Sequence, residues 1–483
     1  MSMGKAAPYA ALAFMALVCA APAAAQQAEK FCIECLQIRV GTPHVVRGPF
    51  PDELDSAFTA LRLPDGRMRG FTANGSTYAV DGANLLDMAG SRQEVLQAGP
   101  PGSVNDCGRW LTSVARTGDT LLGFVHQERA CDYEQDRTEK SMAIATSADD
   151  GITWTDLGTV ISGRDLARPT GFTGEGDCSL VNPIDGYFYA YCLRNSDWQT
   201  IVARAPVDDP TEWRKFFNDS WSEHGLGGEA TAIGFLGTGA GYIRDFAQVA
   251  TVTTDQWFGG IRLSLSADKV TFQDLVSPLI LIDGAEWERP ADTDLLAYAT
   301  ILNPEYGSNT VGQRFLLAYI LVPAGEGFES RHLVLREVSL TLGDESQPEQ
   351  VGLALTRWQD PESGRFITST SALTGDRRLY QEDAVVAHVL TRAPVGIESV
   401  KLAECGSDRP GHLDHLLAED GTCESEGFER ERTAGWLYAT GQPGTFPVYR
   451  CMDDATRSHF ASAAPDCEGL GRMEFVLGYG LEP

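Results

Sequence analysis

The chain has 483 residues and a formal net charge of −29, from 67 acidic and 38 basic side chains. So acidic a chain would be repelled by nucleic acids and anionic membrane surfaces, which argues against those partners. Its 50 glycines, its aromatic residues and the scarcity of long helical patterns predict an all-β protein with many turns. The length is sufficient for two domains.

Residues 1–25 predict a signal peptide that is not part of the fold. Lys5 supplies the positive charge, Ala10–Ala21 is apolar, and Ala23–Ala25 provides small residues for cleavage. No later segment is long and apolar enough to span a bilayer. We therefore expect a secreted protein, extracellular or periplasmic, that does not insert into a membrane. We also expect a monomer.

Ten cysteines remain after removal of the signal peptide, and they fall into close pairs. An even number of paired cysteines in an exported chain predicts disulfides. The predicted pairs are Cys32 with Cys35, Cys107 with Cys131, Cys178 with Cys192, Cys405 with Cys423, and Cys451 with Cys467. For the first pair, a metal site would need a second Cys or His pair and a redox site a βαβ context. Neither is found, so a plain disulfide is favoured.

The segment Ser147–Trp154, Ser-Ala-Asp-Asp-Gly-Ile-Thr-Trp, predicts a tight hairpin between two short strands, 142–146 and 158–161. Asp150-Gly151 is a turn signal, because glycine accepts the positive φ that such turns require. Asp149 can accept hydrogen bonds from the amides of the turn. Trp154 then returns a large apolar face to the sheet.

This hairpin resembles the Asp-box (BNR repeat) of the sialidase superfamily and other β-propellers, S-x-D-x-G-x-T-W, a structural turn usually distant from the active site. A decayed copy at Ser266–Phe272 lacks the glycine and has Phe in place of Trp. The two copies are 119 residues apart, which equals two blades of about 60 residues. The region 36–345 therefore predicts a five-bladed β-propeller, with six shorter blades as the alternative.

The region 350–483 contains an internal repeat. Its two clear copies share five residues at offsets of 43 to 46 positions. They are Cys405, His415, Cys423, Glu424 and Gly435, followed by Cys451, His459, Cys467, Glu468 and Gly478. A degenerate third copy begins near Arg357-Trp358. Three units of this length predict a β-trefoil. The pattern also resembles a repeat in secreted modules beside carbohydrate-active domains, which implies sugar binding.

The region 36–345 resembles the five-bladed glycosidases of the invertase-like and arabinanase-like families, on the block from Ala145 through Trp154 to Ile161. These families place three carboxylates on the innermost strands of the first three blades. The first Asp is nucleophile or base, the second Asp stabilises the transition state or tunes the acid, and a Glu is the acid. The resemblance implies Asp55, Asp177 and Glu229, each placed before a strand-like segment.

The sequence departs from the family motifs around all three acids. Asn-Asp-Pro-Asn-Gly is missing, Gly-Asp-Cys replaces Arg-Asp-Pro at Asp177, and Glu-Ala replaces Glu-Cys at Glu229. Asp52, Glu175 and Glu128 are therefore rival acids, the last because it follows the apolar run 121–125. The predicted substrate-binding residues are His126, Arg109 and Glu175.

The resemblance implies a secreted glycoside hydrolase that keeps one carboxyl protonated and another ionised. Its substrate would be a poly- or oligosaccharide. The first alternative is a non-catalytic carbohydrate-binding protein.

The second alternative is an exo-sialidase, which would need three arginines, for which Arg109, Arg164 and Arg168 are candidates. It would also need an Arg-Ile-Pro-like motif, of which Arg47-Gly48-Pro49 is a poor substitute. No cofactor or metal ligand is predicted, although the sequence leaves open a Ca²⁺ site in the propeller channel.

Overall fold

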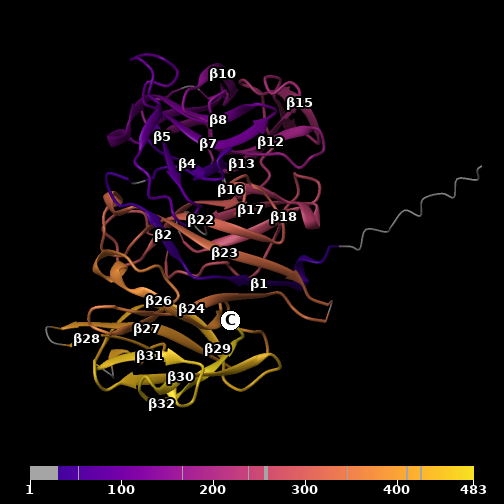
Figure 1. Ribbon diagram of the computed structural model, residues 1–483. Coiled ribbons are helices and arrows are strands. Elements are labelled where there is room, and N and C mark those ends of the chain that lie inside the picture. Colours follow the sequence, from indigo (N-terminus) through magenta and orange to yellow (C-terminus); the bar gives the residue numbers. More distant parts are fainter. Residues whose placement is uncertain are drawn as a thin grey trace, which may run out of the picture. The chain divides into compact units, whose positions relative to one another are not determined.

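The computed structural model describes residues 31–483, except 53, 166, 238, 255–258, 285, 345, 410–411 and 425–426. Residues Cys32–Pro483 form one compact unit, and the predicted signal peptide lies outside the described residues. The described part is built of strands joined by short 3-10 turns, which confirms the all-β prediction (Figure 1). These turns are η1 (Ile33–Cys35), η2 (Tyr133–Gln135), η3 (Arg244–Phe246), η5 (Phe328–Ser330), η6 (Gly375–Leu379) and η8 (Cys467–Gly469). No helix in the described part is long and apolar enough to cross a membrane.

Five antiparallel groups of strands, each called a sheet below, follow one another between residues 59 and 342. The second and third are joined by a short parallel pairing of β9 with β11, and the fifth continues through β1 into the C-terminal strands. The first contains β3 (Thr59–Arg62), β4 (Met68–Asn74), β5 (Ser76–Gly82) and β6 (Gln93–Leu96). The second contains β7 (Gly108–Thr117), β8 (Thr120–Asp132), β9 (Arg137–Ser147) and β10 (Thr155–Ser162). The third contains β11 (Phe172–Val181), β12 (Tyr187–Arg194), β13 (Gln199–Pro206), β14 (Arg214–Phe217) and β15 (Ser220–His224).

The fourth and fifth sheets have the same meander order. The fourth contains β16 (Gly239–Ile243), β17 (Gln248–Thr254), β18 (Ile261–Ser266) and β19 (Gln273–Asp274), with β21 (Thr310–Val311) beside β16. The fifth contains β20 (Leu295–Leu302), β22 (Arg314–Val322) and β23 (His332–Leu342). Its outer strand comes from the start of the described chain, because β1 (Leu36–Val40) and β2 (His44–Arg47) both pair with β23.

The first strand of each sheet contacts the first strand of the next, in the order β3, β7, β11, β16, β20. The ring closes where the backbone N–H of Arg62 on β3 donates to the carbonyl of Tyr306, 3.1 Å away, in the loop after β20. Phe58 and Leu295 lie in one core cluster across the same junction. This closed ring of five sheets is a five-bladed β-propeller, as the spacing of the two Asp-box-like segments predicts.

The inner strands are apolar on both faces because each sheet is covered by a neighbour on either side. On β12, Phe188 and Ala190 pack with Phe124 of the second sheet. The alternate residues, Tyr189 and Tyr191, pack in the cluster that contains residues of the fourth sheet. Side chains alternate between the two faces of a strand, so a strand between two blades needs no polar face.

The predicted hairpin at Ser147–Trp154 joins β9 to β10. Asp149 Oδ1 accepts the backbone N–H groups of Ile152 (3.2 Å) and Thr153 (2.9 Å), and Oδ2 accepts the Thr153 hydroxyl (2.7 Å). Ser147 Oγ accepts the N–H of Gly151 at 2.9 Å. The turn therefore satisfies its own backbone donors. In the decayed copy, between β18 and β19, Asp268 likewise accepts the N–H of Thr271 at 2.7 Å.

Replacing Asp149 with alanine is expected to lower the free energy of unfolding by about 1–2 kcal/mol, because several turn donors lose their acceptor. Burial acts to raise the pKa of Asp149, but hydrogen bonds from Thr153 and Ser147 lower this pKa to about 2. An unfolded aspartate has a pKa of about 3.9. The contribution of Asp149 is therefore present above pH ~4 and lost as the pH falls towards 2. Urea unfolding at pH 7 and pH 3 measures this; an equal difference between wild type and variant at both pH values would contradict it.

The C-terminal strands form three units of three strands each. They are β24 (Gln350–Gln359), β25 (Phe366–Ser369) and β26 (Gln381–Leu390); β27 (Ser399–Arg409), β28 (His412–Glu419) and β29 (Glu429–Tyr438); and β30 (Thr445–Asp453), β31 (Ser458–Ser462) and β32 (Arg472–Leu481). In each unit the first strand pairs with the other two. The third strands, β26, β29 and β32, also pair with one another.

This arrangement accounts for the sequence repeat, whose copies correspond to the three units. The name β-trefoil and the domain boundaries 36–345 and 350–483 stay predictions. Strand β1 connects the two regions, because it pairs antiparallel with β23 and parallel with β24. We call residues 350–483 the three-unit module.

All five predicted disulfides are formed, which confirms the pairing of the ten cysteines. In the propeller, Cys107, the residue before β7, is bonded to Cys131 near the end of β8. Cys178 on β11 is bonded to Cys192 on the adjacent strand β12, and both are fully buried. Each of these two bonds therefore joins neighbouring strands of one sheet. The other bonds join Cys32 to Cys35, Cys405 to Cys423, and Cys451 to Cys467.

Candidate active site

A cavity of about 900 Å³ lies among the five propeller sheets, and each sheet or an adjoining loop contributes to its lining. Representative lining residues are Asp55 before β3, Lys140 on β9, Asp177 on β11, Val252 on β17 and Tyr298 on β20. Because ligands bind preferentially in large concave sites with a few converging polar groups, this cavity is the candidate active site. Two of the four predicted catalytic acids, Asp55 and Asp177, line it.

Asp55 faces Tyr298 on β20 and Arg331, the residue between η5 and β23. The Tyr298 hydroxyl donates to Asp55 Oδ1 at 3.1 Å, and Arg331 Nη1 lies 3.5 Å from the same oxygen. Burial raises the pKa of Asp55, and the attraction of Arg331 and the hydrogen bond from Tyr298 offset this only in part. Asp55 is therefore the carboxyl that retains its proton more readily.

Asp177 is in the opposite electrostatic state. Lys140 Nζ lies 2.9 Å from its Oδ2, and its backbone N–H donates to His126 Nδ1 at 2.9 Å. Burial acts to raise the pKa of Asp177, but His126 and Lys140 outweigh it and hold this pKa below the ordinary value. Asp177 therefore loses its proton at a lower pH than Asp55 does.

Asp177 and Tyr298 both have a left-handed backbone, with φ of 51° and 50°. Each lies at an irregularity in strand pairing, between Gly176 and Ser179 on β11 and between Ala297 and Thr300 on β20. Bulges redirect side chains, and left-handed non-glycine residues are strained and concentrate at functional sites. Two such residues in one cavity support its assignment as the candidate active site.

Glu128 is buried directly behind these residues. Its Oε1 is 3.0 Å from His126 Nε2 and 3.5 Å from Lys140 Nζ, and its Oε2 accepts the Tyr133 hydroxyl at 2.6 Å. Burial acts to raise the pKa of Glu128, yet Lys140, His126 and Tyr133 together lower it. Glu128 is not among the residues that line the cavity, so its role here is to fix Lys140 and His126 beneath Asp177.

Glu229 does not lie with the other acids. It follows β15, in the loop that leads to the fourth sheet, and its carboxylate pairs with Arg164. The preceding residue, Gly228, is anchored through its carbonyl to Lys215 Nζ at 3.0 Å. Glu229 is absent from the described lining of the cavity. Among the rival acids, Asp52 pairs with Arg47 at 2.9 Å.

The three predicted substrate-binding residues lie outside the described lining of the cavity. Arg109 Nη2 pairs with Asp156 Oδ2 at 3.0 Å. His126 is buried beneath Asp177, and Glu175 is buried in an ion pair with Lys215, with Nζ 2.7 Å from Oε2. Of the three arginines proposed for a sialidase, Arg168 lines the cavity, whereas Arg109 and Arg164 pair elsewhere.

Several lining residues were missed by the sequence analysis. They are the aromatic residues Phe172, Trp198, Trp287, Tyr298 and Phe328, with the cations Lys140 and Arg331. Aromatic faces give apolar contact area, and the ring centroids of Trp287 and Phe328 lie 4.7 Å apart. Tyr298 lies in the fifth sheet and Arg331 directly before its strand β23, both more than 240 residues after Asp55, and only a ring closure brings them together. Lys140 alone had a signal, since it precedes the apolar run that leads into the Asp-box-like turn.

No family model matches the sequence, and no curated protein matches it. Among solved structures, the chain is similar to Zg3597, a family 117 glycoside hydrolase produced by the marine bacterium Zobellia galactanivorans. The identity is 9%, the TM-score 0.42, and the match covers 65% of this chain and 92% of that one. It is also similar to the catalytic domain of Coprinopsis cinerea GH62 α-L-arabinofuranosidase, with 11% identity, a TM-score of 0.38 and coverage of 64% and 98%. The propeller assignment rests on the five sheets of this chain.

Proposed function

We propose that this protein is a secreted glycoside hydrolase-like enzyme that cleaves glycosidic bonds in the propeller cavity. The observation that carries the proposal is the pair Asp55 and Asp177, two carboxyls in one cavity whose pKa values are shifted in opposite directions. Glycosidic cleavage needs one protonated and one ionised carboxyl, and such divergence identifies the acid and its partner. The five disulfides are typical of an exported protein.

We assign Asp55 as the general acid and Asp177 as the ionised carboxylate, and the opposite shifts of their pKa values support this assignment. Asp55 would protonate the departing oxygen, and Asp177 would stabilise positive charge at the sugar or activate the attacking group. Asp55 would thus take the acid role that the family resemblance implies for Glu229, while Asp177 would keep the stabilising role implied for it or take the base role implied for Asp55. Glu128 would hold Lys140 in place and thereby keep Asp177 ionised.

A screen of the mature protein against aryl glycosides and polysaccharides tests the proposal. On a glycoside from which the protein releases sugar, the plot of kcat/KM against pH should be bell-shaped. Its acid limb should lie below pH ~3.9, where Asp177 protonates, and its alkaline limb above pH ~3.9, where Asp55 ionises. The Asp55→Asn variant should lose the alkaline limb. It should also retain more activity on aryl glycosides with acidic phenols, because these leaving groups need no proton. An unchanged profile in Asp55→Asn would refute its role.

A carbohydrate-binding protein without catalysis is the second candidate. The ion pair between Asp177 and Lys140 favours it, because a paired carboxylate is a weaker base, and aromatic rings line the cavity. Co-sedimentation with polysaccharide but no sugar release would support this alternative. We propose further that the three-unit module binds polysaccharide, which its separate expression in a pull-down would test.

A further inference from the structure

Because the three units of the module have the same strands, the same structural position can be compared in all three. In each unit, a residue on the first strand faces a bulge residue on the third strand. In the first unit these are Arg357 and Asp383, whose Nε and Oδ2 lie 2.5 Å apart. In the third they are Arg450 and Glu474, with Nε 2.8 Å from Oε2. A cation and an acid thus form an ion pair in both.

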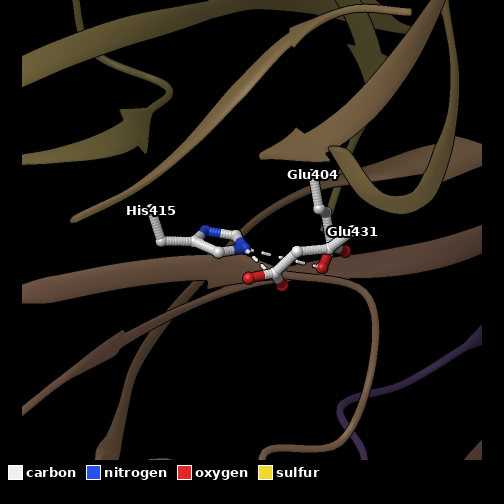
Figure 2. A group of neighbouring side chains, drawn as sticks. All are labelled: Glu404, His415 and Glu431. Carbon is white, nitrogen blue, oxygen red and sulfur yellow. Dashed lines mark ion pairs between the residues drawn. The ribbon is translucent and has the colours of Figure 1, made fainter. Parts of the chain in front are cut away.

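The middle unit breaks this pattern, because Glu404 takes the place of the arginine and faces Glu431. Glu404 is only 1% exposed, so two carboxylates meet in a largely buried setting. Buried like charges are costly unless a cation lies between them. Figure 2 shows His415 pointing its Nε2 at both carboxylates.

The distances from His415 Nε2 to the two carboxylates are close to those between ligand atoms of one metal ion. Nε2 lies 3.7 Å from Glu404 Oε2 and 3.6 Å from Glu431 Oε2. These distances exceed those of hydrogen bonds, and neither ring nitrogen has a hydrogen-bond partner in the described structure although His415 is 3% exposed. Two ligands of a tetrahedral zinc ion, each bonded at about 2.0–2.1 Å, lie roughly 3.3–3.4 Å apart. The three ligand atoms lie within 4.8 Å of one another.

The two carboxylates are already oriented by other groups. Glu404 Oε2 accepts the Ser369 hydroxyl at 2.8 Å, and Oε1 accepts the Thr370 N–H at 2.8 Å. Arg377 donates to both oxygens of Glu431, at 2.7 and 2.9 Å. Glu404 Oε1 also accepts the Thr370 hydroxyl at 3.1 Å. Hydrogen bonds of this kind fix metal-binding carboxylates, and the oxygens that face His415, Glu404 Oε2 and Glu431 Oε2, each keep a second lone pair for an ion.

The corresponding histidine of the third unit, His459, has different hydrogen-bond partners from His415. His459 Nδ1 lies 2.6 Å from Asp414 Oδ2, so its ring has a direct carboxylate partner. It faces Glu474, which Arg450 already neutralises. The third unit therefore has a histidine with a direct carboxylate partner. In the middle unit the ring nitrogens of His415 have no hydrogen-bond partner in the described structure, and its Nε2 lies between two acids, of which Glu431 is also paired with Arg377.

Space next to the cluster also suits an ion. A cavity of about 170 Å³ is lined by Glu431, by the aspartates Asp283, Asp292 and Asp294, and by the arginines Arg336, Arg430 and Arg432. It has room for the water that would complete a three-residue ligand set. Arg432 Nε lies 3.5 Å from Glu404 Oε2, but its charge is offset by Asp294, which it contacts at 2.5 Å.

We propose that Glu404, His415 and Glu431 bind a divalent metal ion of the zinc class, although the sequence analysis predicts no metal. One imidazole and two carboxylates form a ligand set that zinc accepts. Glu431 lies on β29 between Arg430, which pairs with Asp283 at 3.0 Å, and Arg432, which pairs with Asp294. The ion would therefore stabilise the strand that connects the module to the segment between β19 and β20.

Titration of the metal-free, tag-free mature protein with ZnCl₂ in a calorimeter tests the site. We expect one Zn²⁺ per chain, a raised Tm on binding, and visible absorption when Co²⁺ replaces Zn²⁺. His415→Asn and Glu404→Gln should both lose stoichiometric binding. The matched control is His459→Asn in the third unit, which should retain it.

A further variant, Glu404→Arg, restores the residue of the other two units and should bind no Zn²⁺. Near-UV circular dichroism establishes that each variant is folded. The proposal is overturned if the wild type binds no Zn²⁺, which would make a protonated His415 the cation between the two acids. It is equally overturned if His415→Asn and Glu404→Gln, both folded, bind Zn²⁺ as the wild type does.

Discussion

Replacing Asp177 with asparagine is expected to lower the rate of sugar release by about 10²–10⁴-fold, the usual contribution of a positioned acid or base. The asparagine keeps the shape of the side chain but removes the negative charge that Lys140 stabilises. The loss should persist on aryl glycosides with good leaving groups, because Asp177 does not serve the leaving group. Steady-state kinetics on the glycoside that the wild type cleaves measure this loss of rate.

The control for this experiment is Glu229→Gln. Glu229 is paired with Arg164 outside the described lining of the cavity, so its activity should stay near that of the wild type. The opposite result, an inactive Glu229→Gln beside an active Asp177→Asn, would return the catalytic role to the residue that the family order implies. It would also show that the loop after β15 approaches the cavity during turnover.

Replacing Glu175 with leucine is expected to lower the free energy of unfolding by about 3–5 kcal/mol, the usual cost of breaking a buried ion pair. Lys215 is 0% exposed. Without Glu175, the partners left to its ammonium group in the described part of the chain would be the carbonyls of Ser162 and Gly228, at 2.8 and 3.0 Å. Urea unfolding followed by tryptophan fluorescence measures the loss.

The double variant that combines Glu175→Leu with Lys215→Met is the matched comparison. Because it removes both charges, it should recover most of the stability that the single variant loses. A single variant that unfolds within about 0.5 kcal/mol of the wild type, as a surface substitution would, would show that Lys215 finds another partner or releases its proton. A double variant less stable than Glu175→Leu would show that Lys215 matters mainly through its two carbonyl contacts.

Features formed by residues that lie close together in the chain could be predicted from the sequence. The turn at Asp149 is held by hydrogen bonds between residues at most four apart, so its pattern is complete in one segment. The cysteine pairs are separated by 3 to 24 residues, and close partners are favoured when hairpins form. The repeats at Cys405 and Cys451 are visible because each unit must build the same three strands.

The candidate active site is different, because it depends on which distant segments meet. Asp55, Asp177 and Tyr298 belong to the first, third and fifth sheets, and only the closed ring places them in one cavity. Strand order could not reveal that Glu229 leaves the inner ring after β15, or that Glu128 lies behind Lys140.

The cluster of Glu404, His415 and Glu431 also needed the tertiary structure. The repeat places the two histidines in register, but the sequence does not show that Glu404 occupies an arginine position opposite a second acid. That position depends on a bulge in β29 and on the pairing of β27 with two strands. The sequence by itself therefore determined the all-β class, the hairpins, the disulfides and the repeats, which depend on local spacing. The tertiary structure alone decided which charges face one another, because burial and ring closure set those distances.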